Sequence, residues 1–351
     1  MLVASRKRGG VYMRLRKTGH LRFLMLAVFL SSCGTAGDSP STSSTGADQQ
    51  ASQDADSPVR IGFSQYTLGA PYFVELVNSA SREAEARGHE IFVVDAQDSI
   101  NKQLADVEDL LARDIDLLIL NAKDPVGAVP AAKLAAEAGV PVIEVDSSID
   151  PSAPVATTIQ SNNRENGRLV GRWLARQFSG QRIRAALLSG SKGNPVGRAR
   201  RQGITGGIVM QQLEALGSSI SEAEAADFAQ EIDEQLRTRG TARVEAARFE
   251  IVTQGWGNWT HEGGLTAMED MLVAHPDVNC LIAENDSMAL GAIEAIKEAQ
   301  KEELIIVVAG ADGQKEALQL IQEGRYGATG MNNPTVIGRL AVEVGLRVLE
   351  G

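Results

Sequence analysis

The sequence of 351 residues is poor in the residues that build disulfide frameworks and metal centres. It has two cysteines, Cys33 and Cys280, in segments of different character. Cys280 stands inside an apolar run, so we expect a small buried side chain rather than half of a disulfide. The four histidines show no metal-ligand spacing, and the three beyond the N-terminal segment lie at or near expected helix ends: His89, His261 and His275. The sequence therefore predicts neither a disulfide scaffold nor a metal site.

Motifs of common catalytic and cofactor chemistry are also missing. There is no G-x-S-x-G elbow, no H-E-x-x-H helix and no G-x-G-x-x-G dinucleotide fingerprint. The glycine-rich stretch 189–195 lacks the Gly-Lys-Ser/Thr that closes a phosphate-binding loop, so we expect a plain turn there. We predict no enzymatic activity and no cofactor.

Outside its N-terminal segment, the sequence has no excess of positive charge. The net charge is −11, although residues 1–32 hold seven basic side chains and no acidic ones. Removing those seven charges from −11 would leave −18. A body this acidic argues against nucleic acid as a partner.

Long hydrophobic runs are lacking as well, and the apolar run over 21–30 is too short for a permanent transmembrane helix. With the basic residues before it, this run predicts an export signal over 1–32. It ends in Leu30-Ser31-Ser32-Cys33, which resembles the lipobox of bacterial lipoproteins. That resemblance implies cleavage before Cys33, lipidation of Cys33 and membrane attachment through the lipid anchor. The alternative is an ordinary secretory signal with an incidental cysteine.

Residues 33–57 contain almost nothing apolar and are rich in Gly, Ser, Thr, Asp and Gln. Such a composition cannot bury a core, so we predict a flexible tether. From residue 58 onward, short apolar runs alternate with segments of helical periodicity. Strands are predicted over 59–64, 91–94, 117–120, 142–145 and 157–161, with helices between them. This alternation predicts an α/β fold with a parallel sheet covered by helices on both faces.

Polar residues follow several of these strands, namely Asp95, Asn121 and Asp146. Because the carboxyl ends of parallel strands share one edge of a sheet, this is either a binding edge or ordinary loop chemistry. Tyr72 and Phe73 open a helix at the same edge. Phe73 falls on the apolar face of that helix, whereas Tyr72 points roughly 100° away and is the better candidate for a ligand contact.

The same scheme repeats after residue 162, with strands predicted over 185–188, 251–253, 280–283, 304–309 and 328–331. Three arginines, Arg198, Arg200 and Arg201, are expected at the start of one helix. They are either a functional group or a cluster exposed to solvent. Residues 218–247 are dense in Glu, Ala and Arg, and we predict a surface helical insertion to which no chemistry is assigned.

Asn285 and Asp286 come directly after the apolar run 280–283 and just before a helix. At this position such residues either bind a ligand or only cap the helix. Trp256 and Trp259 are predicted on a loop after the strand at 251–253. An aromatic side chain exposed beside a binding edge favours stacking on a ligand, although Trp256 could instead pack against the insertion.

With these residues identified, the chain resembles the ribose/galactose-type periplasmic sugar-binding proteins, the substrate-binding components of ABC transporters with the type I periplasmic binding fold. The resemblance covers about residues 58–351. The motifs that carry it are Ile61-Gly62-Phe63, Pro71-Tyr72-Phe73, residues 141–146, Ser161-Asn162-Asn163, Arg200-Arg201-Gln202-Gly203, Ala274-His275-Pro276-Asp277 and residues 285–292.

The family implies two doubly wound parallel-sheet lobes joined by a multi-strand hinge, with residues 58–161 and 333–351 in the N-terminal lobe and 162–332 in the C-terminal lobe. A sugar or related polyol would be held between them. The ligand-binding residues implied by position are Tyr72, Phe73, Asp146, Arg200, Trp259, Asn285, Asp312 and Asn332.

The resemblance further implies a lipid-anchored, monomeric, extracytoplasmic protein that delivers its ligand to an ABC permease in the inner membrane. The alternative is a sugar-sensing domain that presents its closed form to a chemotaxis or sensor-kinase partner. Two departures, Ser147 and Ala70 in place of the Arg and Asn frequent in ribose binders, argue against ribose itself. The sequence also ends where the family adds a further strand.

Overall fold

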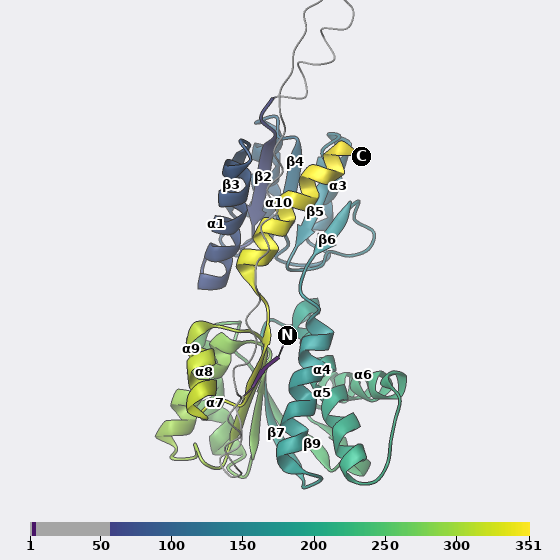
Figure 1. Cartoon of the computed structure of the whole chain (residues 1–351), viewed down its shortest axis with the longest axis vertical. Helices are drawn as coiled ribbons and strands as arrows, with labels where there is room; N and C mark the ends of the chain where they lie inside the picture. The colour runs from purple at the N-terminus through teal and green to yellow at the C-terminus, as the bar shows by residue number, and fades with distance from the viewer. Residues whose placement is uncertain (1, 5–56) are drawn as a thin grey trace, which may run out of the picture. The chain divides into compact units, whose positions relative to one another are not determined.

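The computed structural model describes residues 2–4 and 57–351 (Figure 1). The predicted lipidation site Cys33 and the tether 33–57 lie outside these residues, apart from residue 57, and so does most of the predicted signal. Within the signal, Leu2–Ala4 forms a short strand, β1. No helix among the described residues has the length and apolar character needed to cross a membrane.

The N-terminal lobe is built on a five-stranded parallel sheet with the order β3-β2-β4-β5-β6. Its strands are β2 (Arg60–Gln65), β3 (Glu90–Asp95), β4 (Leu117–Asn121), β5 (Val142–Val145) and β6 (Thr157–Ile159). Side chains alternate between its two faces along a strand. In β4, Leu117 and Ile119 pack on one face, and Leu118 and Leu120 on the other.

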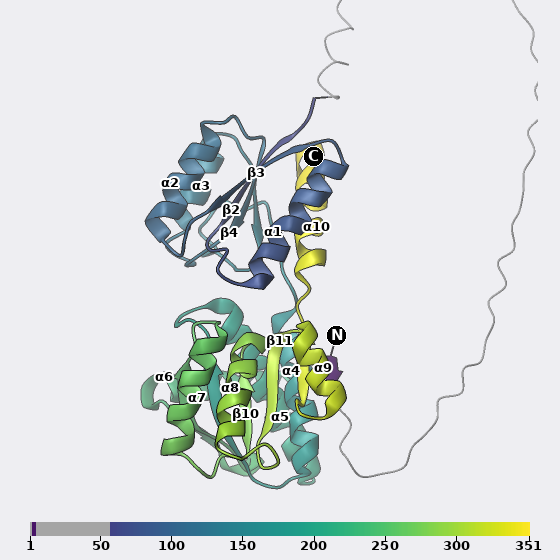
Figure 2. The ribbon, with the colours of Figure 1, turned by 90° about the vertical axis from the view of Figure 1, so that its left-hand side faces the viewer.

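Helices cover both faces of this sheet (Figures 1 and 2). One face packs against α1 (Pro71–Ala86) and α10 (Pro334–Glu350), and the other against α2 (Ile100–Leu111) and α3 (Val129–Glu137). The C-terminal helix therefore returns to the first lobe.

The C-terminal lobe holds a seven-stranded sheet with the order β1-β12-β11-β10-β7-β9-β8. Its central strands are parallel, and the two edge strands, β1 and β8 (Ala242–Val244), are antiparallel to their neighbours. The parallel strands are β7 (Ile183–Ser189), β9 (Phe249–Trp256), β10 (Cys280–Ala283), β11 (Ile306–Asp312) and β12 (Ala328–Met331). The α/β class with two doubly wound lobes is confirmed.

Two layers of helices enclose the second sheet. One face buries α4 (Asn163–Phe178) and α5 (Pro195–Ala215), with α6 (Glu222–Arg239) packed beside them. The other face buries α7 (His261–Ala274), α8 (Asp286–Glu298) and α9 (Lys315–Glu323). Cys280 is buried in this core, as predicted, and burial raises the pKa of its thiol well above the ordinary value.

Two segments among the described residues connect the lobes, one between β6 and α4 and the other between β12 and α10. They are joined by a hydrogen bond in which the Ser161 hydroxyl donates to Oδ1 of Asn332 at 2.6 Å. The carboxyl ends of the central strands in each lobe lead to the loops that carry the site described below.

Several sequence expectations need correction. Strand β9 extends to Trp256, so Trp256 is the last strand residue rather than a loop residue, and only Trp259 lies on the following loop. Helix α5 begins at Pro195, three residues before Arg198, because Pro fits the first turn and Asn194 caps it.

The segment 218–247 is more than a surface helix. Helix α6 buries four small or apolar side chains, Ala225, Ala229, Ile232 and Leu236. The same segment then supplies β8, whose residues pair with the first half of β9. Its sequence hid this role because half of its buried stripe is alanine, which carries little hydrophobic signal.

Candidate functional site

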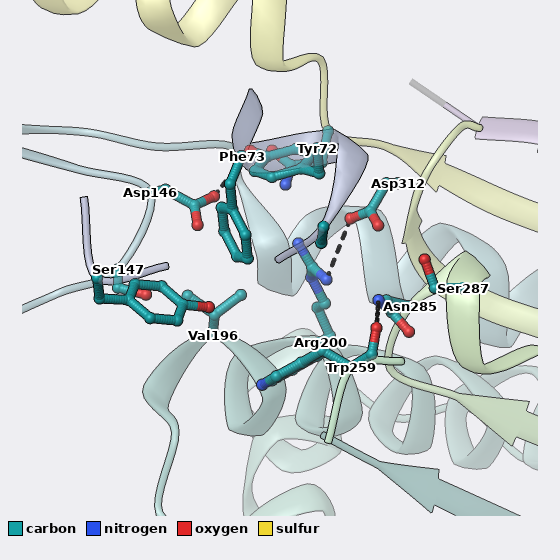
Figure 3. Close-up of a pocket in the computed structure, with 13 residues that line it drawn as sticks. Tyr72, Phe73, Asp146, Ser147, Val196, Arg200, Trp259, Asn285, Ser287 and Asp312 are labelled. Carbon is teal, nitrogen blue, oxygen red and sulfur yellow. Dashed lines mark hydrogen bonds and ion pairs between the residues drawn. The ribbon is translucent and has the colours of Figure 1, made fainter. Parts of the chain in front are cut away.

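A cavity that opens to solvent lies among loops of both lobes, at the carboxyl ends of their strands (Figure 3). All eight predicted ligand-binding residues line it. The full lining is Tyr66, Ala70, Tyr72, Phe73, Asp146, Ser147, Val196, Arg200, Trp259, Asn285, Ser287, Asp312 and Asn332.

Aromatic rings form much of the first-lobe wall. Pro71 begins α1, and the fixed φ of proline suits this first helical position, so Tyr72 and Phe73 fall in the first turn beside the cavity. The Phe73 ring meets those of Tyr66 and Tyr72 edge-on, with centroids 4.9 and 5.4 Å apart. Phe73, expected in the core, is 9% exposed and borders the cavity as well.

Asp146 lies next to these rings, directly after β5, with a left-handed φ of 62°. Its Oδ1 accepts a hydrogen bond of 2.8 Å from the Tyr72 hydroxyl. Burial, and after it the charge of Asp146, raises the pKa of both Tyr66 and Tyr72 well above the ordinary tyrosine value. Both hydroxyls therefore remain protonated and can donate hydrogen bonds.

Arg200 is the central cation of the second-lobe wall and is only 3% exposed. Its Nε donates to Oδ1 of Asn163 at 2.9 Å, and its Nη1 donates to the carbonyl oxygen of Glu284 at 3.1 Å. Nη1 also lies 3.4 Å from Oδ1 of Asp312. Among the described residues, Nη2 has no partner, so this end of the guanidinium is free to donate to a ligand.

Trp259 lies on the loop between β9 and α7, with a left-handed φ of 66°. Its ring is 5.9 Å from the Arg200 guanidinium carbon and packs against Gly190. A Cβ at Gly190 would lie 2.0 Å from Cε2 of the indole, so only glycine permits this contact. The ring thus offers a flat apolar surface beside a cation.

Asn285 both caps a helix and lines the cavity, so the two alternatives raised by the sequence are not exclusive. Its Oδ1 accepts from the Met288 N–H at 3.1 Å, and its Nδ2 donates to the Trp259 carbonyl at 3.2 Å. Asp286, in contrast, is fully buried and accepts from the N–H groups of Gly313 and Gln314 and from the Tyr326 hydroxyl. Asp286 is structural.

Asp312 and Asn332 stand at the ends of β11 and β12. The pKa of Asp312 is raised to about 6, mainly by burial; the Arg200 charge lowers it, and the neighbouring Asp286 and Asp146 charges contribute to the rise. At neutral pH this carboxyl is therefore mainly ionised, although at a cost.

Five lining residues were outside the predicted set: Tyr66, Ala70, Ser147, Val196 and Ser287. Ala70 and Ser147 stood out only as departures from the family pattern, and Tyr66 follows directly on β2. Ser287 lies in the Asn-Asp-Ser run after β10, which was a usable signal. Val196 had none, because an apolar residue in a first helical turn is ordinary.

Several hydrogen-bonding groups of the cavity have no partner among the described residues, and they indicate what the cavity can bind. They include Nη2 of Arg200, Oδ2 of Asp146, the Tyr66 hydroxyl and the Ser147 hydroxyl. Donors, acceptors and hydroxyls that serve as either are thus intermixed between aromatic rings. Such a lining suits a molecule with several hydroxyls and an apolar ring face. The described residues contain no group of three or more His, Cys, Asp or Glu side chains placed to hold a metal.

Comparisons with known proteins agree with this geometry. A family model described as "Periplasmic binding protein domain" matches residues 61–351. The chain is 33% identical over 291 residues to the ribose import binding protein RbsB of Bacillus subtilis, covering 83% of this chain and 82% of that protein. It is 30% identical to the Escherichia coli protein of the same name, covering 81% and 83%. Among solved structures, a Mycobacterium smegmatis ABC transporter solute-binding protein with bound glycerol is 31% identical, with a TM-score of 0.70, covering 84% of this chain and 89% of that one.

Proposed function

We propose that this chain, which belongs to the periplasmic binding protein family, captures a sugar or related polyol between its lobes and delivers it to an ABC importer. The observation that carries the proposal is the convergence of all eight predicted residues on one cavity. Asp146, Asp312 and Arg200 supply acceptors and a donor for hydroxyls, and Trp259 supplies a stacking surface. Ribose binding by relatives supports the sugar class.

Binding would proceed by hinge closure. Tyr72, Phe73 and Asp146 belong to the first lobe, and Arg200 and Trp259 to the second, so only a ligand that touches both sets draws the lobes together. The closed form gains contacts that the open form lacks, and this difference drives the equilibrium. A permease would recognise the closed form.

Membrane attachment is the second part of the proposal. Members of this family act outside the cytoplasm, and the Leu30-Ser31-Ser32-Cys33 motif supports a lipid anchor on Cys33. A Cys33→Ser variant is expected to lose acyl labelling and to appear in the soluble extracytoplasmic fraction. Unchanged membrane retention of this variant would contradict the anchor.

Thermal unfolding with a panel of pentoses, hexoses and cyclitols tests the ligand class. A sugar at about 100 times its Kd adds roughly 2.7 kcal/mol to the free energy of unfolding, or about 5 °C in Tm. Uptake of that sugar by cells with and without the protein then tests import. No shift with any polyol, in protein shown by mass spectrometry to be free of ligand, would overturn the sugar assignment.

A further inference from the structure

A buried ion-pair network lies behind the second-lobe wall of the cavity, in groups that the proposed function does not use. Its centre is Glu284, the residue before Asn285, which is 1% exposed. Its carboxylate accepts from the Gly190 N–H at 2.8 Å and from Nη1 of Arg201 at 2.5 Å. A buried carboxylate without such partners would be strongly unfavourable, so Arg201 and the Gly190 N–H offset the cost of burying this side chain.

Arg201 joins this carboxylate to α6. Its Nε donates to Oδ1 of Asp233 at 2.7 Å, and Gln202 donates to the other oxygen of Asp233 at 2.7 Å. Burial lowers the pKa of Arg201, but the charges of Glu284 and Asp233 raise it more, so the guanidinium stays charged. Through Asp233, the segment 218–247 is therefore tied to the wall of the cavity.

Glu284 contacts both Arg200 and the glycine against which Trp259 packs. Its backbone carbonyl accepts the hydrogen bond from Arg200. Its carboxylate binds the N–H of Gly190, against which the Trp259 ring packs. A Cβ at Gly197 would lie 2.3 Å from Oε2 of Glu284 and 3.0 Å from Cη2 of Trp259. Oε2 of Glu284 and the edge of the indole thus both border Gly197.

We propose that Glu284 is a positioning residue that holds Trp259 and Arg200 in the geometry that binds the ligand, and that Arg201 and Asp233 hold Glu284. This rests on the proposed sugar site. It also gives a role to two features of the sequence that were left without one, the second arginine of the Arg200-Arg201 pair and the 218–247 segment.

Glu284→Gln keeps the size of the side chain and removes its charge. Ligand affinity is expected to fall tenfold to a hundredfold, the range for a charge-assisted hydrogen bond. Asp233→Asn acts one step further away and should cost about threefold to tenfold. The matched control on the same helix is Arg237→Gln, which breaks an exposed pair with Glu234 and should leave affinity unchanged.

A double-mutant cycle separates positioning from general loss of stability. If Glu284 acts through Trp259, Glu284→Gln should cost less than about threefold in affinity once Trp259 is replaced by Leu, because the positioned ring is gone. Fully additive losses in affinity would overturn this part of the proposal.

The near-ultraviolet circular dichroism of Trp259 gives a second readout that needs no ligand. In a background with Trp173→Phe and Trp256→Phe, the band of the remaining indole should weaken in Glu284→Gln and, less so, in Asp233→Asn, with far-ultraviolet spectra unchanged. An unchanged band in both variants would overturn the positioning role. If the wild-type protein binds no sugar, the proposed function fails, while this band still decides the role of Glu284.

Discussion

The two walls of the cavity are held in different ways. In the first lobe, Tyr66, Tyr72 and Phe73 support one another through ring contacts, and a single hydrogen bond joins Tyr72 to Asp146. In the second lobe, Arg200 and Trp259 depend on buried charges and on glycines that admit close packing. Ring packing tolerates small changes, whereas a buried ionic network loses much of its effect when one member is removed.

The largest loss of ligand affinity is expected when Arg200, the central cation of the second-lobe wall, is removed. Arg200→Met keeps an unbranched side chain similar to the aliphatic part of arginine, but leaves Asp312 and Asn163 without their cation. Affinity for the ligand is expected to fall by a factor of a hundred or more, which titration calorimetry would measure. Retention of affinity within tenfold would mean that the second-lobe wall does not depend on its central charge.

Gly190→Ala tests the packing of Trp259 directly. The new Cβ would overlap the indole, so the ring must move and the stacking surface is displaced. We expect a loss of affinity of ten- to fiftyfold. Gly193→Ala is the matched control for a glycine in the same turn, because no atom lies within 4 Å of its Cβ position, although its positive φ adds some strain. Equal losses of affinity in the two variants would refute the packing argument.

The ionised side chain of Asp312, in the second-lobe wall, is expected to lower the free energy of unfolding of the protein without ligand. Its pKa is raised from 3.8 to about 6, so ionisation as the pH rises through this window destabilises the folded protein without ligand. Asp312→Asn should therefore be more stable than the wild type at pH 7.5, by about 3 kcal/mol at most, with little difference at pH 4.

Urea unfolding at both pH values measures this difference. The same variant should bind the ligand more weakly, because it loses an ionic acceptor. A lower free energy of unfolding for Asp312→Asn than for the wild type at pH 7.5 would contradict this prediction.

The smallest effect is expected in the first lobe. Tyr72→Phe keeps the ring and its contact with Phe73, and removes only the hydroxyl that donates to Asp146. The lost hydrogen bond joins two residues of the same lobe and not the protein to its ligand, so affinity should fall only about fivefold, or about 1 kcal/mol. A loss as large as that of Arg200→Met would show that both walls depend equally on polar contacts.

Much of this molecule could be predicted from local patterns. The strands β4, β5 and β10 are short, mainly apolar runs with polar residues at or after their ends, and these runs predict a parallel sheet. The runs alone did not decide whether its edge binds a ligand. Five of the eight site residues lie in the motifs that carry the family resemblance: Tyr72, Phe73, Asp146, Arg200 and Asn285. The other three, Trp259, Asp312 and Asn332, follow expected strands and were implied by their position in the family.

Other features could not be predicted from local sequence patterns. The Glu284–Arg201 pair joins residues 83 positions apart. Arg201 stands out in the sequence as part of an arginine cluster, but nothing there indicates that Glu284 is its partner. The sequence does not show where the strand before Trp256 and Trp259 ends. The continued pairing of β9 with β7 places Trp256 in the strand and only Trp259 at the cavity.

The sequence by itself determined the alternation of strands and helices, the acidic body and the residue types that gather at the strand ends, because these follow from local periodicity and composition. The tertiary structure alone decided which charges are buried together and which indole packs on glycine. Burial and partner choice depend on side chains brought together from distant parts of the chain, and no window of sequence contains that information.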